Sequence, residues 1–236
     1  WYFLDGTHKI GIGYREVNFS LSRDQQKILN RQNIHDGTFE KLPSMSWGFV
    51  PLTRYQGGGP EAVLEPLKDH LKDYEMLMVQ YYGAGVQACY RGPRLYDTES
   101  TRLVVSKTID WYKKYRNILN ADIVQLRRAD GRDWDGWMHV SPFTVQKGFM
   151  MLFNPTKEVM TKTIKLPLYY TGLTQKVKIT DSNGRANQYN LIRDYNIDFT
   201  LTIQAPATIN VQNAMYKEAF LASIFFHQSS RGPPSW

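Results

Sequence analysis

Short apolar runs alternate with amphipathic segments between residues 45 and 120, and this alternation most constrains the fold. Residues 47–52 (WGFVPL) and 86–90 (VQACY) have the composition of short buried strands. After the first run, apolar side chains recur at spacings of three and four, at Leu64, Leu67, Leu71, Tyr74 and Met78. A second helix is predicted over residues 98–120. Strands that alternate with helices imply parallel strands joined by helical crossovers.

From residue 121 onward the pattern changes to short strands separated by turn signals. The predicted strands are residues 123–126, 137–140, 149–153, 161–166, 175–179 and 199–203. The turn signals between them are Asp130-Gly131, Asn154-Pro155, Thr171-Gly172 and Asn183-Gly184. Several short strands at such spacing predict an antiparallel β-sandwich.

The 236 residues are enough for one large domain or two small ones. We place the boundary near residue 121, with an α/β region over 1–120 and a β-sandwich over 121–236. The sandwich ends in an irregular tail, in which Asn213–Phe226 could be a helix and residues 229–236 have no predicted structure.

A further helix is predicted near the start of the chain, over residues 21–33. Ser22 and Gln25 have the spacing of a capping box, which closes the first turn of a helix. Gly37 and Pro43 are expected to end it.

Polar side chains follow both apolar runs of the α/β region. The side chains are Arg54, Tyr55, Arg91, Arg94, Tyr96 and Asp97. Three consecutive glycines, residues 57–59, accompany the first group. In parallel α/β layers and barrels the binding site lies at the carboxyl ends of the strands, so both groups are expected at one shared opening.

Arginine in this setting binds carboxylate, phosphate or sulfate through two parallel hydrogen bonds, and it also binds sugar hydroxyls. Asp97 is the one candidate for a catalytic group. Two structural alternatives stay open: Arg94 could pair with Asp97, and Asp97 could cap the following helix. Glycoside hydrolysis usually needs two carboxylates that face one cleft. The two loops offer Asp97 and Glu61 at best, and Glu61 begins a helix, so the pair is incomplete.

Charge and composition argue against several other classes of function. The net charge of +7 and the isoelectric point near 9.3 suit an anionic partner, but the basic residues form no long stripe, so nucleic acid is not the expected ligand. The single cysteine, Cys89, excludes an intrachain disulfide and a thiolate zinc cluster. The histidines lack metal-ligand spacing and no phosphate-binding loop is present, so no metal or cofactor is expected. No apolar run is long enough to predict a membrane span.

Three segments together resemble a known group of enzymes. They are WYKKYRNIL, ADIVQLRRADGRDWDGWMHVSP and GFMMLFNPTKEVMTKTIKLPLYYTGL, preceded by GVQACYRGPRLYD. They resemble the passage from the last barrel helix into the C-terminal β-domain of retaining-type glycoside hydrolases with (β/α)8 barrels, the α-galactosidase-like group among them. The resemblance covers about residues 45–205, and the sequence from Ala205 onward departs from it.

The resemblance implies that residues 47–52 and 86–90 are the last two barrel strands and that the catalytic carboxylates lie on earlier strands, outside this sequence. It implies a secreted, glycoside hydrolase-like protein that binds a glycan, with a further protein chain as a possible partner that completes the barrel. Carried over by position, the subsite residues would be Arg54, Tyr55, Arg91, Arg94 and Asp97. The alternative is a non-catalytic structural or interaction subunit on a degenerate glycosidase-like scaffold.

Overall fold

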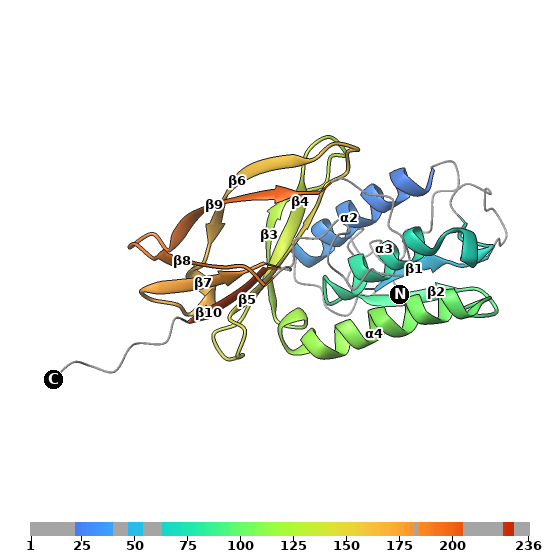
Figure 1. Ribbon diagram of the computed structural model, residues 1–236, viewed down its shortest axis with the longest axis horizontal. Helices are drawn as coiled ribbons and strands as arrows, with labels where there is room; N and C mark the ends of the chain where they lie inside the picture. Colours follow the sequence, from blue (N-terminus) through green and yellow to red (C-terminus); the bar gives the residue numbers. More distant parts are fainter. Residues whose placement is uncertain (1–21, 40–46, 54–62, 182–183, 205–223, 229–236) are drawn as a thin grey trace, which may run out of the picture. The chain divides into compact units, whose positions relative to one another are not determined.

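The computed structural model describes residues 22–39, 47–53, 63–181, 184–204 and 224–228, which fall into two compact units (Figure 1). Among these residues, the α/β unit holds those up to Asn120 together with Arg128–Gly131, and the β unit holds the others. The short segment Arg128–Gly131 thus belongs with the helical residues although the strands on either side of it belong to the β unit.

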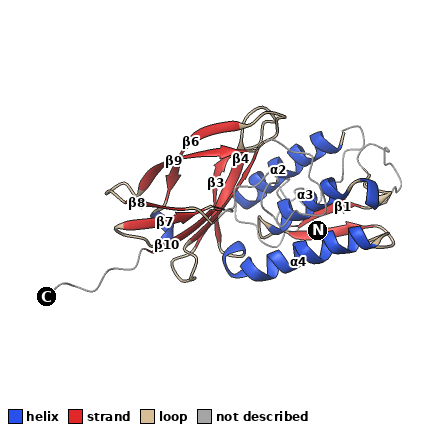
Figure 2. Ribbon diagram, viewed as in Figure 1, coloured by secondary structure: helices blue, strands red, loops and turns tan. Residues whose placement is uncertain are grey.

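The α/β unit contains a pair of parallel strands joined by a helical crossover (Figure 2). Its elements are α2 (Arg23–Phe39), β1 (Trp47–Pro51), the 3₁₀ turn η3 (Leu67–Asp69), α3 (Leu71–Tyr82), β2 (Gln87–Arg91) and α4 (Glu99–Leu119). The register of the pair runs from Trp47 opposite Gln87 to Pro51 opposite Arg91. The predicted alternation of strand and helix, with parallel strands, is therefore confirmed.

Helix α3 is the centre of this unit, because it contacts both strands as well as α2 and α4. Its residues from Met76 to Tyr81 are all buried, and Tyr74, two residues before Met76, is fully buried. A helix covered on so many sides has little room for a polar face, which explains its largely apolar sequence.

The start of α3 corrects the sequence-based prediction. Leu64 was expected on this helix, but its backbone N–H donates to Pro51 O at 3.0 Å, and the α-helix begins only at Leu71. Pro66 has extended backbone angles, with φ of −70° and ψ of 127°. Proline disfavours helical angles in the residue before it, so the apolar spacing continues through a segment that is not helical.

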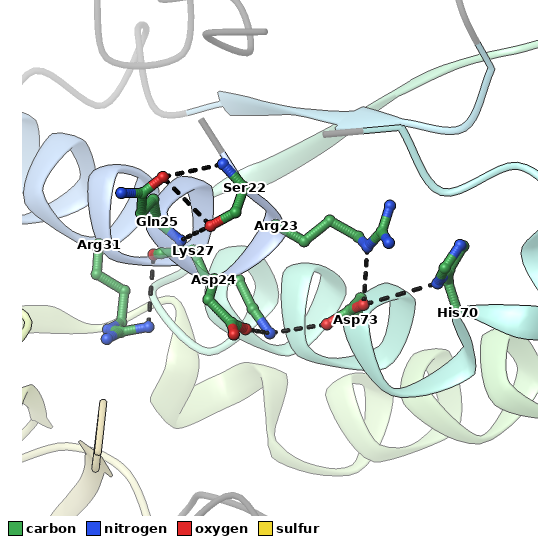
Figure 3. A network of polar contacts seen from close by, with 8 residues as sticks. All are labelled: Ser22, Arg23, Asp24, Gln25, Lys27, Arg31, His70 and Asp73. Carbon is green, nitrogen blue, oxygen red and sulfur yellow. Dashed lines mark hydrogen bonds and ion pairs between the residues drawn. The ribbon is translucent and has the colours of Figure 1, made fainter. Parts of the chain in front are cut away.

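Helix α2 begins at the predicted capping box and is tied to α3 by ion pairs (Figure 3). Gln25 N donates to Ser22 Oγ at 3.3 Å, and Ser22 N donates to Gln25 Oε1 at 3.0 Å. The Asp73 carboxylate on α3 lies 2.7 Å from Lys27 Nζ and 3.3 Å from Arg23 Nε.

The end of α2 also differs from the prediction. The helix passes through Gly37 and ends at Phe39, beyond the expected end at Asn33. Thr38 Oγ1 donates to Ile34 O at 2.6 Å in this last turn. A single glycine costs a helix only about 1 kcal/mol, so neighbouring contacts can outweigh it.

The β unit consists of antiparallel strands in two sheets. Its strands are β3 (Asp122–Arg127), β4 (Asp135–Val140), β5 (Gly148–Phe153), β6 (Met160–Pro167), β7 (Lys176–Thr180), β8 (Ala186–Asn190), β9 (Asn196–Ile203) and β10 (Ile224–Gln228). One sheet has the order β3-β4-β5-β10-β7-β8, and β6 pairs with β9 in the other. The prediction of antiparallel strands after residue 121 is confirmed.

One hydrophobic core joins the two sheets of the β unit. It draws side chains from both of them, including Met138, Met150, Val177, Ile164, Leu166 and Phe199. β6 and β9 alternate buried and exposed residues along much of their length, as expected for strands with one face on a core. All six residues of β4, and all six of β5, are buried.

Two strands of the β unit were not predicted from the sequence. β8 has the polar sequence ANQYN and lies at one end of its sheet, where packing demands few apolar residues. β10 lies between β5 and β7, and its residues 224–226 fall where the sequence had allowed a helix. Phe226 is fully buried in the shared core. The segment from Ala205 onward therefore does contribute a strand to the β unit.

Candidate functional site

The carboxyl ends of β1 and β2 meet, as their parallel register requires. The backbone N–H groups of Leu52 and Thr53 both donate to Arg91 O, at 2.9 and 3.2 Å. A Cβ atom built on Gly92 would lie 2.7 Å from the Cβ of Leu52, so the residue after β2 must be small. We call Thr53, Glu65 and residues 91–97 the rim.

A chain of polar contacts links three segments across the rim. Arg94 Nη2 lies 2.9 Å from Glu65 Oε1, and Thr53 Oγ1 donates to Glu65 Oε2 at 2.5 Å. The side chains of Arg94 and Glu65 are 58% and 36% exposed, so the pair is open to solvent. Such an exposed pair contributes little to the free energy of folding. A ligand that competes with Glu65 for the Arg94 guanidinium would therefore lose little by breaking the pair.

Asp97 is held by donors from two neighbouring segments. Its Oδ2 accepts from the backbone N–H of Lys68 at 3.2 Å, and its Oδ1 lies 3.0 Å from Thr101 Oγ1. Thr98, the next residue, is the N-cap of α4 and accepts from the backbone N–H of Thr101. The ion pair of Arg94 is therefore with Glu65, and the helix is capped by Thr98 rather than Asp97.

The carboxyls of Glu65 and Asp97 are both set to be ionised at neutral pH. The hydrogen bond from Thr53, followed by that from Arg94, lowers the pKa of Glu65. Burial acts to raise the pKa of Asp97, but backbone N–H groups and Thr101 outweigh it, and the pKa is lowered. A general acid at neutral pH needs a raised pKa, so these carboxyls suit hydrogen-bond acceptance.

A buried side chain supports the exposed part of the rim loop. Leu95 and Tyr96 are 40% and 48% exposed, and the fully buried Tyr74 donates its hydroxyl to Leu95 O at 2.9 Å. Burial raises the pKa of Tyr74, so this hydroxyl keeps its proton at any ordinary pH. Arg91 is half-buried at the end of β2.

Four of the predicted site residues lie within one short stretch of the rim: Arg91 ends β2, and Arg94, Tyr96 and Asp97 lie in the loop that follows. The other two, Arg54 and Tyr55, lie outside the described residues, as does Glu61. Sequence reasoning missed Thr53 and Glu65. No periodic signal marks them, because the contacts of Glu65 with Thr53 and with Arg94 join residues far apart in the sequence.

No group of three or more His, Cys, Asp or Glu side chains is arranged to hold a metal ion in the part of the chain that the structure describes. Among the same residues, none of the helices combines the length and the apolar character that a membrane crossing demands.

No family model matches this sequence, and no curated protein matches it. Several solved glycosidase structures are similar to it. The galactosidase domain of an α-galactosidase–sucrose kinase is 16% identical, with a TM-score of 0.47, over 85% of this chain and 25% of that one. An α-galactosidase from Lactobacillus brevis is 13% identical, with a TM-score of 0.49, over 90% and 26%. α-Galactosidase I from Mortierella vinacea is 7% identical, with a TM-score of 0.39, over 91% and 66%. The chain spans about a quarter of the length of the first two. The names of these three structures are those of the group that the sequence resembles.

Proposed function

We propose that the chain is the C-terminal part of a glycoside hydrolase-like protein and that its rim binds a glycan. In this proposal β1-α3-β2-α4 corresponds to the last β/α units of a (β/α)8 barrel, and the β unit is its C-terminal β-sandwich. The proposal rests on the sequence resemblance of residues 45–205 and on the position of the rim at the carboxyl ends of parallel strands.

The observation that carries the binding role is the exposed pair of Arg94 and Glu65. It offers guanidinium donors and carboxylate acceptors side by side, with the ring of Tyr96 in the same loop. Sugar hydroxyls both donate and accept hydrogen bonds, so they match a surface that provides both groups. The Tyr96 ring adds an apolar face on which a sugar ring can stack.

Titration of the chain with raffinose, an α-galactosyl oligosaccharide, tests this role. We expect Arg94→Ala to weaken binding at least tenfold. Arg102→Ala is the matched control, since Arg102 is similarly exposed at 48% and also pairs with a glutamate, Glu99, but on α4. Binding by neither the wild type nor any variant, across raffinose and a panel of other oligosaccharides, would overturn the proposal.

A non-catalytic interaction subunit is the second candidate, because both oxygens of the Glu65 carboxylate and both oxygens of Asp97 already accept hydrogen bonds within the chain. Neither carboxyl is poised to protonate a leaving group near neutral pH. This candidate predicts a stable assembly with other chains, which light scattering would detect. A strictly monomeric sample that hydrolyses a glycoside would rule it out.

A further inference from the structure

Three tyrosines gather at one end of the β6–β9 sheet, in the β unit. Tyr169 and Tyr170 begin the 3₁₀ turn η4 (Tyr169–Thr171) directly after β6, and Tyr195 directly precedes β9. The backbone N–H of Leu168 donates to Tyr195 O at 2.9 Å, which continues the pairing of the two strands beyond their ends. Figure 1 shows β6 and β9 side by side, although they are far apart in the sequence.

The three rings form a continuous aromatic cluster. The centroids of the Tyr169 and Tyr170 rings are 5.3 Å apart and their planes meet at 88°. The centroids of the Tyr169 and Tyr195 rings are 5.5 Å apart, with an interplanar angle of 85°. Tyr169 and Tyr170 are 66% and 63% exposed, and Ile192, three residues before Tyr195, is 67% exposed. No hydrogen bond links any of the three hydroxyls to another described residue. Contiguous exposed apolar surface on a soluble unit commonly marks a binding site.

The turn that carries Tyr169 and Tyr170 is closely packed from Leu168 to Gly172. Leu168 and Thr171 are both fully buried, and Thr171 Oγ1 donates to Leu168 O at 2.6 Å. Gly172 has φ of +73°, and a Cβ there would lie 2.7 Å from the Cβ of Pro142, so the turn is closely packed. A rigid support fixes the rings before a ligand arrives, which lowers the entropic cost of binding.

Tyr195 occupies a backbone conformation that does not suit its residue type. Its φ of +55° makes it the one non-glycine among the described residues with positive φ. Asp194 and Asn196 hold the turn, since Asn196 N donates to Asp194 Oδ1 at 3.1 Å and Asn196 Nδ2 donates to Asp194 O at 2.9 Å. Glycine or asparagine would fit this position with less strain, so the tyrosine ring is present at a cost to stability.

We infer that Tyr169, Tyr170 and Tyr195 form a carbohydrate-binding surface for neutral oligosaccharides, separate from the rim. A pyranose ring has an apolar C–H face and hydroxyls around its edge. The cluster offers the matching combination of aromatic faces and phenolic hydroxyls that have no partner among the described residues. Lys165 Nζ lies 3.9 Å from Asp194 Oδ2, and Asp194 directly precedes Tyr195, so these opposite charges offset one another, which suits a neutral ligand.

Calorimetric titration of the full chain with maltohexaose and cellohexaose, rather than the raffinose used for the rim, tests this inference. We expect at least one of these sugars to bind, and Tyr169→Ala/Tyr170→Ala to weaken that binding at least tenfold. Phe143→Ala is the matched control, because Phe143 is also in the β unit and is 94% exposed. Arg94→Ala should leave binding at the tyrosines unchanged, which separates this surface from the rim.

A second variant distinguishes a binding role of the Tyr195 ring from a structural one. Tyr195→Gly removes the ring and relieves the backbone strain, so we expect it to weaken sugar binding at least tenfold while the melting temperature stays equal or rises. A lower melting temperature with unchanged affinity would overturn the inference. It would also be overturned by absence of binding in the wild type, or by self-association that the double variant abolishes without any sugar affinity.

Discussion

The hydroxyl of Tyr74 donates to the carbonyl oxygen of Leu95 at 2.9 Å, and this bond joins the core helix α3 to the rim loop. Tyr74 is fully buried, whereas Leu95 is 40% exposed. The conformation of the exposed loop therefore depends on a side chain that no ligand could touch. A substitution in the core can consequently change the rim without altering its own residues.

Tyr74→Phe removes this bond and should lower the free energy of unfolding by about 1 kcal/mol, the usual contribution of one hydrogen bond. Urea unfolding measures the change. Tyr112→Phe is the control: the Tyr112 hydroxyl bonds to Asn120 Oδ1 at an exposed site, so its loss should cost less. Equal losses in the two variants would show that the Tyr74 hydroxyl has no special structural role.

The pair of Asp36 and Arg128 predicts a stability change in acid. Arg128 Nε and Nη2 donate to the two Asp36 oxygens at 2.7 and 2.8 Å, and these bonds lower the pKa of Asp36 in the folded state. Stability from a carboxyl of this kind is present above its unfolded pKa of about 3.9 and is lost as the pH falls through the folded pKa.

Asp36→Asn should therefore be less stable than the wild type at pH 7, by about 1 kcal/mol or less because the pair is partly exposed. The difference should shrink as the pH falls below about 4, where the wild-type carboxyl becomes protonated. Urea unfolding at several pH values measures it. A difference that stays constant from pH 7 to pH 2.5 would contradict this account.

Replacing Glu75 on α3 should change stability at neutral pH in the opposite direction from replacing Asp36. Burial raises the pKa of Glu75, and Lys107 only partly offsets this effect. A carboxyl with a raised folded pKa contributes stability below its unfolded pKa, and that contribution is lost as the pH rises through the folded pKa. Glu75→Gln should therefore raise the free energy of unfolding at pH 7, by about 1 kcal/mol or less. The gain should disappear near pH 4; a loss of stability at pH 7 would refute the prediction.

Two glycines of the β unit form a matched pair. Gly172 and Gly184 have φ of +73° and +80°, but a Cβ on Gly172 would meet Pro142 at 2.7 Å, whereas one on Gly184 would meet nothing within 4 Å. Gly184→Ala should cost about 1 kcal/mol from backbone strain alone. Gly172→Ala should cost more, about 2–3 kcal/mol, since steric overlap adds to the strain. Thermal unfolding of both variants tests the order, which would be wrong if Gly184→Ala were the more damaging.

Local and periodic features were predictable from the sequence. The capping box at Ser22, the apolar run of β5 and the parallel pairing of β1 with β2 all follow from patterns within a few residues or from simple alternation. Contacts between distant segments were not. Glu65 pairs with Arg94, and β10 pairs with β5, across long separations in the sequence.

Spacing along the chain located the candidate site residues but not the groups that they contact. Arg94 and Asp97 could be placed on one loop because they directly follow a strand, but their partners could not be assigned. Asp97 bonds to the backbone of Lys68, and a backbone donor carries no sequence signature at all. Side-chain spacing therefore locates such a loop without revealing which of its groups are already occupied.

β1 and β2 form a sheet of only two strands among the described residues, and this affects how the protein behaves in concentrated solution. Among the described residues no third strand joins this pair, so each strand has one flank whose amides and carbonyls are not used by a ladder. Such flanks can recruit a strand from another molecule. In concentrated samples of the chain, aggregation is therefore expected to begin at these flanks.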